Sequence, residues 1–329
     1  MINNTLNVAV DCGKHTTKAI SKINGCMSTI KFRTKVQEVT DFGGDINYNN
    51  YLINDGSKSY LIGDMVSETA TNYNLSKQTE SFKQCSYLAI CLLIDKFHLP
   101  ITGTININLA INMPLTLYKN VQHKNSLKEF IVNNNNNIDF TVNHKTYHFK
   151  INNIVVLPEA LGPIYTKMND FREKRVTVID VGSLNVSYTN YNNLTPQLDS
   201  MISSNAGTNI LRAQIAETLS SKYNTHISDS DVEYLLKQDK FFYLDGTKQL
   251  ESKAIIEQLI EQHTHNIFNF AKSRGYTFNN TDLVFCGGGT LLLKEAILKI
   301  YPMATIEEDS QFTNVRSFYK ILDVKYGQA

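Results

Sequence analysis

The segment 175–192 reads R-V-T-V-I-D-V-G-S-L-N-V-S-Y-T-N-Y-N, and the rest of the chain can be placed relative to it. Its apolar, β-branched run 176–179 predicts a buried strand, and residues 186–191 predict a return strand. We therefore expect a β-hairpin with Asp180 at its turn. We also expect a positive φ at Gly182, because a turn that brings several N–H groups onto one point usually requires one. Such a turn binds anions, and a carboxylate beside it can hold hydrated Mg²⁺.

A second copy of this pattern lies near the N-terminus. Residues 7–20 read N-V-A-V-D-C-G-K-H-T-T-K-A-I, again a short apolar strand, an Asp-x-Gly and a polar return strand. Asp11 and Asp180 are about half the chain apart, which is the spacing that two tandem copies of one domain give. A single Asp-x-Gly is usually an ordinary hairpin turn, whereas two copies suit a nucleoside triphosphate. Lys18 is either a phosphate ligand or a solvated strand residue.

Composition narrows the class of protein. The chain has 329 residues, 42% of them hydrophobic, and its length suggests two domains. The net charge of +1 argues against a general nucleic-acid coat. The five cysteines form no C-x-x-C pair, which indicates neither a disulfide framework nor a zinc site. We see no signal peptide, and the longest apolar stretch, 87–94, is too short to span a bilayer, so we expect a cytoplasmic protein.

Two further predicted strands end in residues that could take part in catalysis or ligand binding. Segment 154–159, I-V-V-L-P-E, predicts a buried strand followed by a helix that begins at Pro158-Glu159. Glu159 is either a base that orients a water or an acid favoured by the helix dipole. Segment 283–289, L-V-F-C-G-G-G, predicts a strand that runs into a glycine turn before a helix at 290–301. Such a turn lets a phosphate or a planar ligand approach the backbone, or it serves tight packing.

The remaining patterns predict mostly helices. The polar segment 203–208 is expected to cap a helix over 209–223. Helical spacing of apolar residues also predicts helices over 81–97, 228–240, 253–273 and 311–322, and alternation predicts a strand over 105–111 and a hairpin arm over 140–149.

The order of these motifs resembles the actin, Hsp70 and sugar-kinase superfamily over nearly the whole chain. The chain length and the closing segment 314–320, N-V-R-S-F-Y-K, are most similar to the bacterial plasmid-segregation actins of the ParM type. The resemblance implies an actin-like α/β fold with two duplicated ribonuclease-H-like domains flanking a nucleotide cleft. Domain I would comprise residues 1–162 and 311–329, and domain II residues 163–310.

The resemblance also implies roles for individual residues. ATP or GTP would bind with Mg²⁺, which Asp11 and Asp180 would position through water, and these two would share catalysis with Glu159. Lys14 and His15 stand where relatives usually have small hydroxyl residues, which predicts a phosphate contact made by charge. The implied nucleotide contacts are Gly13, Lys14, Lys18, Gly182, Ser183, Gly207, Glu217, Gly287, Gly288 and Gly289.

The function implied by the resemblance is that of a filament-forming ATPase or GTPase. Such proteins assemble head to tail and hydrolyse the γ-phosphate by an activated water. They segregate plasmids through a ParR-like DNA-binding adaptor on a centromere-like site, with no direct nucleic-acid or membrane contact. The alternatives are a small-molecule kinase and an Hsp70-like switch. The first should carry an Asp base in a substrate pocket, and the second appends a peptide-binding domain.

Overall fold

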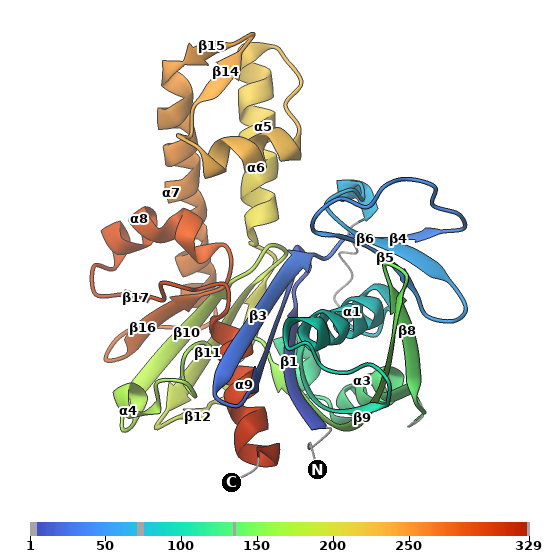
Figure 1. Cartoon of the computed structure of the whole chain (residues 1–329). Coiled ribbons are helices and arrows are strands. Elements are labelled where there is room, and N and C mark those ends of the chain that lie inside the picture. The colour runs from blue at the N-terminus through green and yellow to red at the C-terminus, as the bar shows by residue number, and fades with distance from the viewer. Residues whose placement is uncertain (1–4, 71–75, 134–135, 328–329) are drawn as a thin grey trace. The chain divides into compact units, whose positions relative to one another are not determined.

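The computed structural model describes residues 5–70, 76–133 and 136–327 (Figure 1). The chain divides into two compact units. The first consists of residues 1–170 and 312–329, and the second of residues 171–311. The second unit is therefore inserted between two parts of the first.

The first unit is built on one large mixed sheet. Within the described residues its strand order is β3-β2-β1-β7-β9-β8-β5-β6-β4. The strands are β1 (Thr5–Cys12), β2 (Thr16–Ile23), β3 (Cys26–Arg33), β4 (Val36–Val39), β5 (Asn50–Asn54), β6 (Ser59–Gly63), β7 (Ile105–Met113), β8 (Ile138–Val142) and β9 (Lys145–Pro158). Strands β1 and β2 form the predicted antiparallel hairpin, while β7 runs parallel to both β1 and β9. The carboxyl ends of these three parallel strands therefore meet at one edge of the sheet.

Helices cover both faces of this sheet. They are α1 (Glu80–Lys96), α2 (Leu115–Tyr118), α3 (Val121–Val132) and the closing α9 (Thr313–Tyr326). Val8 and Val10 of β1 belong to the same core cluster as the apolar residues of α1, whereas Ala9 points to the other face because side chains alternate along a strand. Figure 1 shows α9 on the opposite side of β1 and β2 from α1.

The second unit repeats the central part of the first. Its described strands run β12-β11-β10-β16-β17, with β13 paired to β11. They are β10 (Arg175–Val181), β11 (Val186–Asn192), β12 (Thr195–Pro196), β13 (Ile202–Ser204), β16 (Asp282–Cys286) and β17 (Thr305–Ile306). Strand β10 is antiparallel to β11 and parallel to β16, as β1 is to β2 and β7. The two copies predicted from the Asp-x-Gly segments are therefore copies of one sheet topology.

The helices of the second unit pack on that sheet or on one another. They are α4 (Met168–Phe171, which begins at the end of the first unit), α5 (Thr208–Tyr223), α6 (Asp229–Lys237), α7 (Leu250–Ser273) and α8 (Thr290–Ile300), and a small hairpin is formed by β14 (Phe242–Leu244) and β15 (Thr247–Gln249). Helix α6 packs against α5. Tyr188, Phe268 and Phe285 are buried at the centre of their core. No helix within the described ranges is both long and apolar enough to cross a membrane.

One predicted helix is absent. Strand β9 ends at Pro158 as expected, but residues 160–161 have no regular structure, residues 162–166 form turns, and the helix expected to begin at Glu159 does not form. The physical reason is backbone conformation, because Ala160 and Gly162 have φ values of +58° and +54° in the left-handed region. Because no helix begins at Glu159, a helix dipole does not explain the acidic residue at this position.

Candidate functional site

The two Asp-x-Gly turns are closed in the same way. Gly13 N donates to Thr16 O at 3.2 Å, and Gly182 N donates to Asn185 O at 2.9 Å. A Cβ at either glycine would lie 2.8 Å from that same carbonyl oxygen. The expected positive φ at Gly182 is wrong, since neither glycine is among the described residues with positive φ. Glycine is needed here because the backbone closes too tightly for any side chain.

Across the first hairpin, Asp11 faces a lysine. The register pairs Asp11 with Lys18, and Lys18 Nζ donates to Asp11 Oδ2 at 3.0 Å. Each side chain is only 11% exposed, so Lys18 is not a solvated strand residue. In the second hairpin the matching register pairs Asp180 with Ser187. The two copies therefore differ in charge, because the first turn carries a cation where the second carries a hydroxyl.

Glu159 is held at the carboxyl edge of the first sheet. Its backbone N–H donates to Met113 O at 3.0 Å, and its Oε1 accepts from Asn112 Nδ2 at 3.3 Å. Asn112 in turn accepts from the backbone N–H of Cys12 at 3.1 Å. Buried Asn112 thus connects the end of β1 with the end of β9, and the structure brings Glu159 to the first turn.

Sequence reasoning missed Lys77, which also reaches this edge. Lys77 Nζ donates to Cys12 O and lies 3.7 Å from Glu159 Oε1. Burial, together with repulsion from Lys77, lowers the pKa of Lys14 to about 8. Hydrogen bonding by Cys85, together with the nearby lysine charges, lowers the pKa of the buried Cys12 thiol to about 7. The end of β1 is therefore a region of positive potential that suits a polyphosphate.

In the second unit, the glycines after β16 lie against the second turn. A Cβ at Gly287 would lie 2.2 Å from Asp180 Oδ1, and one at Gly289 would lie 2.5 Å from Thr208 Cγ2. Gly289 N donates to Val181 O at 2.9 Å. Gly288 is exposed, and a Cβ there would meet its nearest atom at 3.9 Å. Tight packing therefore requires Gly287 and Gly289, whereas Gly288 leaves its backbone open.

Helix α5 begins on the second turn. Thr208 N donates to Gly182 O at 3.1 Å, and Asn209 N donates to Ser183 O at 3.0 Å. These carbonyls replace the polar side-chain cap that we expected over 203–208, since the cap residue Gly207 makes no side-chain bond. Glu217 lies ten residues further along α5 and is exposed, so it is separated from Gly207 by roughly 15 Å along the helix axis.

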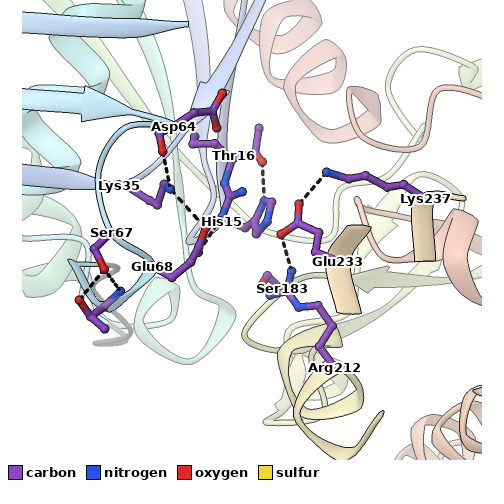
Figure 2. Close-up of polar contacts among 12 residues, drawn as sticks. His15, Thr16, Lys35, Asp64, Ser67, Glu68, Ser183, Arg212, Glu233 and Lys237 are labelled. Atoms are coloured by element: carbon purple, nitrogen blue, oxygen red, sulfur yellow. Dashed lines mark hydrogen bonds and ion pairs between the residues drawn. The ribbon is translucent and has the colours of Figure 1, made fainter. Parts of the chain in front are cut away.

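An ion-pair network joins the second turn to α6 (Figure 2). Arg212 Nη2 donates to Ser183 Oγ at 3.5 Å, and Arg212 Nη1 lies 3.3 Å from Glu233 Oε2. Glu233 Oε1 also accepts from Lys237 at 2.8 Å. These contacts hold the N-terminal part of α5, the turn and α6 together within the second unit.

The donor set fits a magnesium ion that is held mainly through water. Within the described residues, no group of three or more His, Cys, Asp or Glu side chains could hold a metal. Mg²⁺ usually keeps several waters and takes only one or two carboxylates together with substrate phosphates. Asp11 Oδ2 is already bonded to Lys18, which favours an indirect contact. Asp11 therefore suits an indirect contact with the ion, and the joint role of Asp11 and Asp180 stays a prediction.

Two family models cover most of the chain. Residues 9–162 match the model described as "Actin like proteins N terminal domain". Residues 178–299 match "Archaeal actin homologue MreB-like, C-terminal". The chain belongs to the actin-like proteins, and its fold is the actin-like α/β fold that its sequence predicts.

Among the solved structures that resemble this chain are ParM-type and Alp filament proteins. A filament of Alp12 is 26% identical with a TM-score of 0.71, covering 98% of this chain and 99% of that one. A 15-stranded ParM filament from Clostridium botulinum is 16% identical with a TM-score of 0.77, with the same coverage.

An archaeal actin homologue shares the fold as well. It is 14% identical with a TM-score of 0.80, covering 97% of this chain and 99% of that one. The same homologue has been solved in complex with ADP. Sequence comparison with curated proteins gives no match.

Proposed function

We propose that this chain binds a nucleoside triphosphate with Mg²⁺ through its two Asp-x-Gly turns and hydrolyses the γ-phosphate. The observation that carries this proposal is the repetition of the turn. Gly13 and Gly182 each close on the carbonyl three residues later, next to an aspartate at the same register. An anion-binding turn that occurs in both copies of a duplicated fold suits a ligand with several phosphates.

The proposal assigns a role to Glu159, Lys14 and Lys18. Glu159 orients the attacking water and accepts its proton, because its carboxylate is fixed by Asn112 before any substrate arrives. Lys14 neutralises phosphate charge at the first turn, and Lys18 holds the Asp11 carboxylate in place through its ion pair. The bound magnesium would neutralise charge on the phosphate oxygens. Phosphoryl transfer depends mostly on such positioning and charge stabilisation.

The other predicted contacts belong to the same proposal. Ser183 and Gly207 lie at the second turn, where Gly207 packs against the Ser183 carbonyl. Gly288, with its open backbone, is the best placed of the three consecutive glycines to approach the nucleotide. Glu217 is proposed for the ribose side. The ADP complex of the archaeal homologue supports a nucleotide ligand, and ATP and GTP are both proposed as substrates.

We also propose that nucleotide binding drives assembly into filaments that segregate plasmids in the cytoplasm. The Alp12 and Clostridium botulinum ParM structures are filaments, which supports self-assembly of this chain. A ParR-like adaptor would link the filament to a centromere-like plasmid site. The net charge of +1 agrees with an adaptor rather than direct DNA binding.

Right-angle light scattering tests the proposal. ATP or GTP with Mg²⁺ is added to the purified protein, and phosphate release is followed in the same cuvette. We expect scattering to rise and then to fall as phosphate appears, with the preferred nucleotide giving the larger signal. Phosphate release without scattering, over a wide range of protein concentration, would rule out the filament and favour a soluble enzyme.

A further inference from the structure

Lys77 is a buried cation that no sequence motif explains. It lies just before α1 and is only 4% exposed, although burying an ammonium is costly unless its charge is matched. Its Nζ donates to Cys12 O at the end of β1 and faces Glu159 Oε1 at the end of β9. It also lies 5.4 Å from the centre of the Phe82 ring in α1. One side chain thus connects the first turn, the catalytic carboxylate and a core helix.

A second buried lysine in the same unit shows what a purely structural pair looks like (Figure 2). Lys35 is 5% exposed and donates to Asp64 O and to Glu68 Oε1 at 3.1 and 3.2 Å. Arg33 donates to both oxygens of Glu68 at 2.9 and 2.8 Å. The contacts of Arg33 and Lys35 to the Glu68 carboxylate are all within hydrogen-bonding distance.

The contact at Glu159 is more open. The 3.7 Å between Lys77 Nζ and Glu159 Oε1 is an ion-pair distance that is too long for a hydrogen bond. Asn112 donates to the same oxygen. A carboxylate held on Oε1 from two sides presents Oε2 to a water. The neighbouring Lys14 adds a further positive charge. The cluster of Lys14, Lys77 and Glu159 therefore has two cations and one anion, which favours binding of an anion.

We propose that Lys77 is a positioning residue for γ-phosphate hydrolysis. Its ammonium fixes the Glu159 carboxylate relative to the first turn, so that Oε2 meets the attacking water in one orientation. Lys77 acts through Glu159 and transfers no proton itself. This inference rests on the proposed function, because it assigns a role within the same site.

The test compares two matched substitutions. Lys77→Met and Lys35→Met each remove a buried ammonium that bonds a carbonyl and faces a carboxylate, but only the first lies at the site. We expect Lys77→Met to lower kcat by roughly 10- to 100-fold with KM nearly unchanged, because misplacing a catalytic group slows chemistry more than binding. Lys35→Met should lower the melting temperature while leaving kcat unchanged. Equal kcat in Lys77→Met and the wild type would overturn the inference.

A double-mutant cycle tests whether Lys77 acts through Glu159. In a Glu159→Gln background, Lys77→Met should cause little further loss, since the group that it positions is already gone. A further loss as large as that in the wild type would show an independent role and refute the proposal. If Lys77→Met does not fold, Lys77→Arg decides: we expect a partial loss of kcat at an unchanged melting temperature, and full activity would refute the inference.

The same measurements separate this inference from the function on which it rests. A wild-type protein that neither binds nor hydrolyses ATP or GTP would remove both. Wild-type turnover with a fully active Lys77→Met would remove only the role of Lys77. Binding of a non-hydrolysable ATP or GTP analogue, measured by calorimetry, should be nearly equal in wild type and Lys77→Met.

Discussion

Gly287 lies directly against Asp180, so closely that a Cβ at residue 287 would sit 2.2 Å from Asp180 Oδ1. Gly287 also has a φ of +90°. Strand β16, which runs parallel to β10, ends at Cys286, and its next residue forms one wall around the second aspartate. The position of this carboxylate is therefore set by a backbone that only glycine allows.

Gly287→Ala should disturb both stability and the second turn. The left-handed backbone and the contact with Asp180 should together cost roughly 1–3 kcal/mol of unfolding free energy. Gly288→Ala is the matched control, because a Cβ there meets its nearest atom at 3.9 Å and should change stability by less than about 0.5 kcal/mol. Urea unfolding of both variants measures the difference. Equal stability in the two variants would contradict the packing described here.

Glu159→Gln should separate assembly from hydrolysis. The amide keeps the shape of the side chain but cannot act as a base, so phosphate release should fall roughly 10²- to 10⁴-fold. Nucleotide-dependent scattering should remain and should decay more slowly. The same outcome is expected for Glu159→Ala, whereas phosphate release at the wild-type rate in either variant would exclude Glu159 from the reaction.

Lys14 should make nucleotide binding depend on pH. Its pKa is lowered from 10.5 to about 8, first by burial and then by Lys77, so a fraction of the ammonium groups is deprotonated near pH 8. A bound polyphosphate stabilises the charged form and raises this pKa, so binding should take up protons between about pH 7 and 9. Affinity should weaken as the pH rises through that range. Little uptake through Lys14 is expected at pH 6, where the group is already charged.

Calorimetry in buffers with different ionisation enthalpies measures this uptake. Lys14→Met is the control, because protons taken up by the nucleotide itself contribute to both proteins and cancel in the difference. The same proton uptake in Lys14→Met as in the wild type, at pH 8, would exclude Lys14 as its source.

Glu233→Gln should loosen the helices at the second turn. The change leaves the Arg212 guanidinium, whose side chain is 12% exposed, without its carboxylate partner. We expect a loss of roughly 1–3 kcal/mol of unfolding free energy. Glu257→Gln removes a surface pair with Lys253 and should change stability by less than about 0.5 kcal/mol. Chemical unfolding curves that shift equally for the two variants would show that the Arg212 network adds nothing.

Much of the fold can be predicted from the sequence because hydrophobic periodicity and turn residues are local signals. The two hairpins, the strand before Glu159 and most helix ranges follow from such patterns and are confirmed. The wrong helix at Glu159 has a different origin. Ala160 has a positive φ that its residue type disfavours, and Asn314 and Ser317 hold the following Gly162 from the far end of the chain. No local pattern reveals such a long-range constraint.

The candidate site was only partly predictable for the same reason. The proline before Glu159 at a predicted strand end indicates a site residue, and the repeated Asp-x-Gly motif indicates the two aspartates. Lys77 and Asn112 reach the site through the fold, from before a helix and from within a strand. Asn112 is one of several polar residues in β7, and only the parallel register places it between Cys12 and Glu159.

The position of helix α9 in the sequence affects how the protein folds during translation. Its Asn314 accepts from Gly162 N, and Ser317 donates to Gly162 O, so α9 packs into a unit whose other elements lie before residue 171. During translation the face of β1 and β2 that α9 covers stays exposed to solvent until residues 313–326 have left the ribosome. Contacts this distant in sequence slow folding. We therefore expect the nascent protein to depend on chaperones longer than a chain whose domains mature in order.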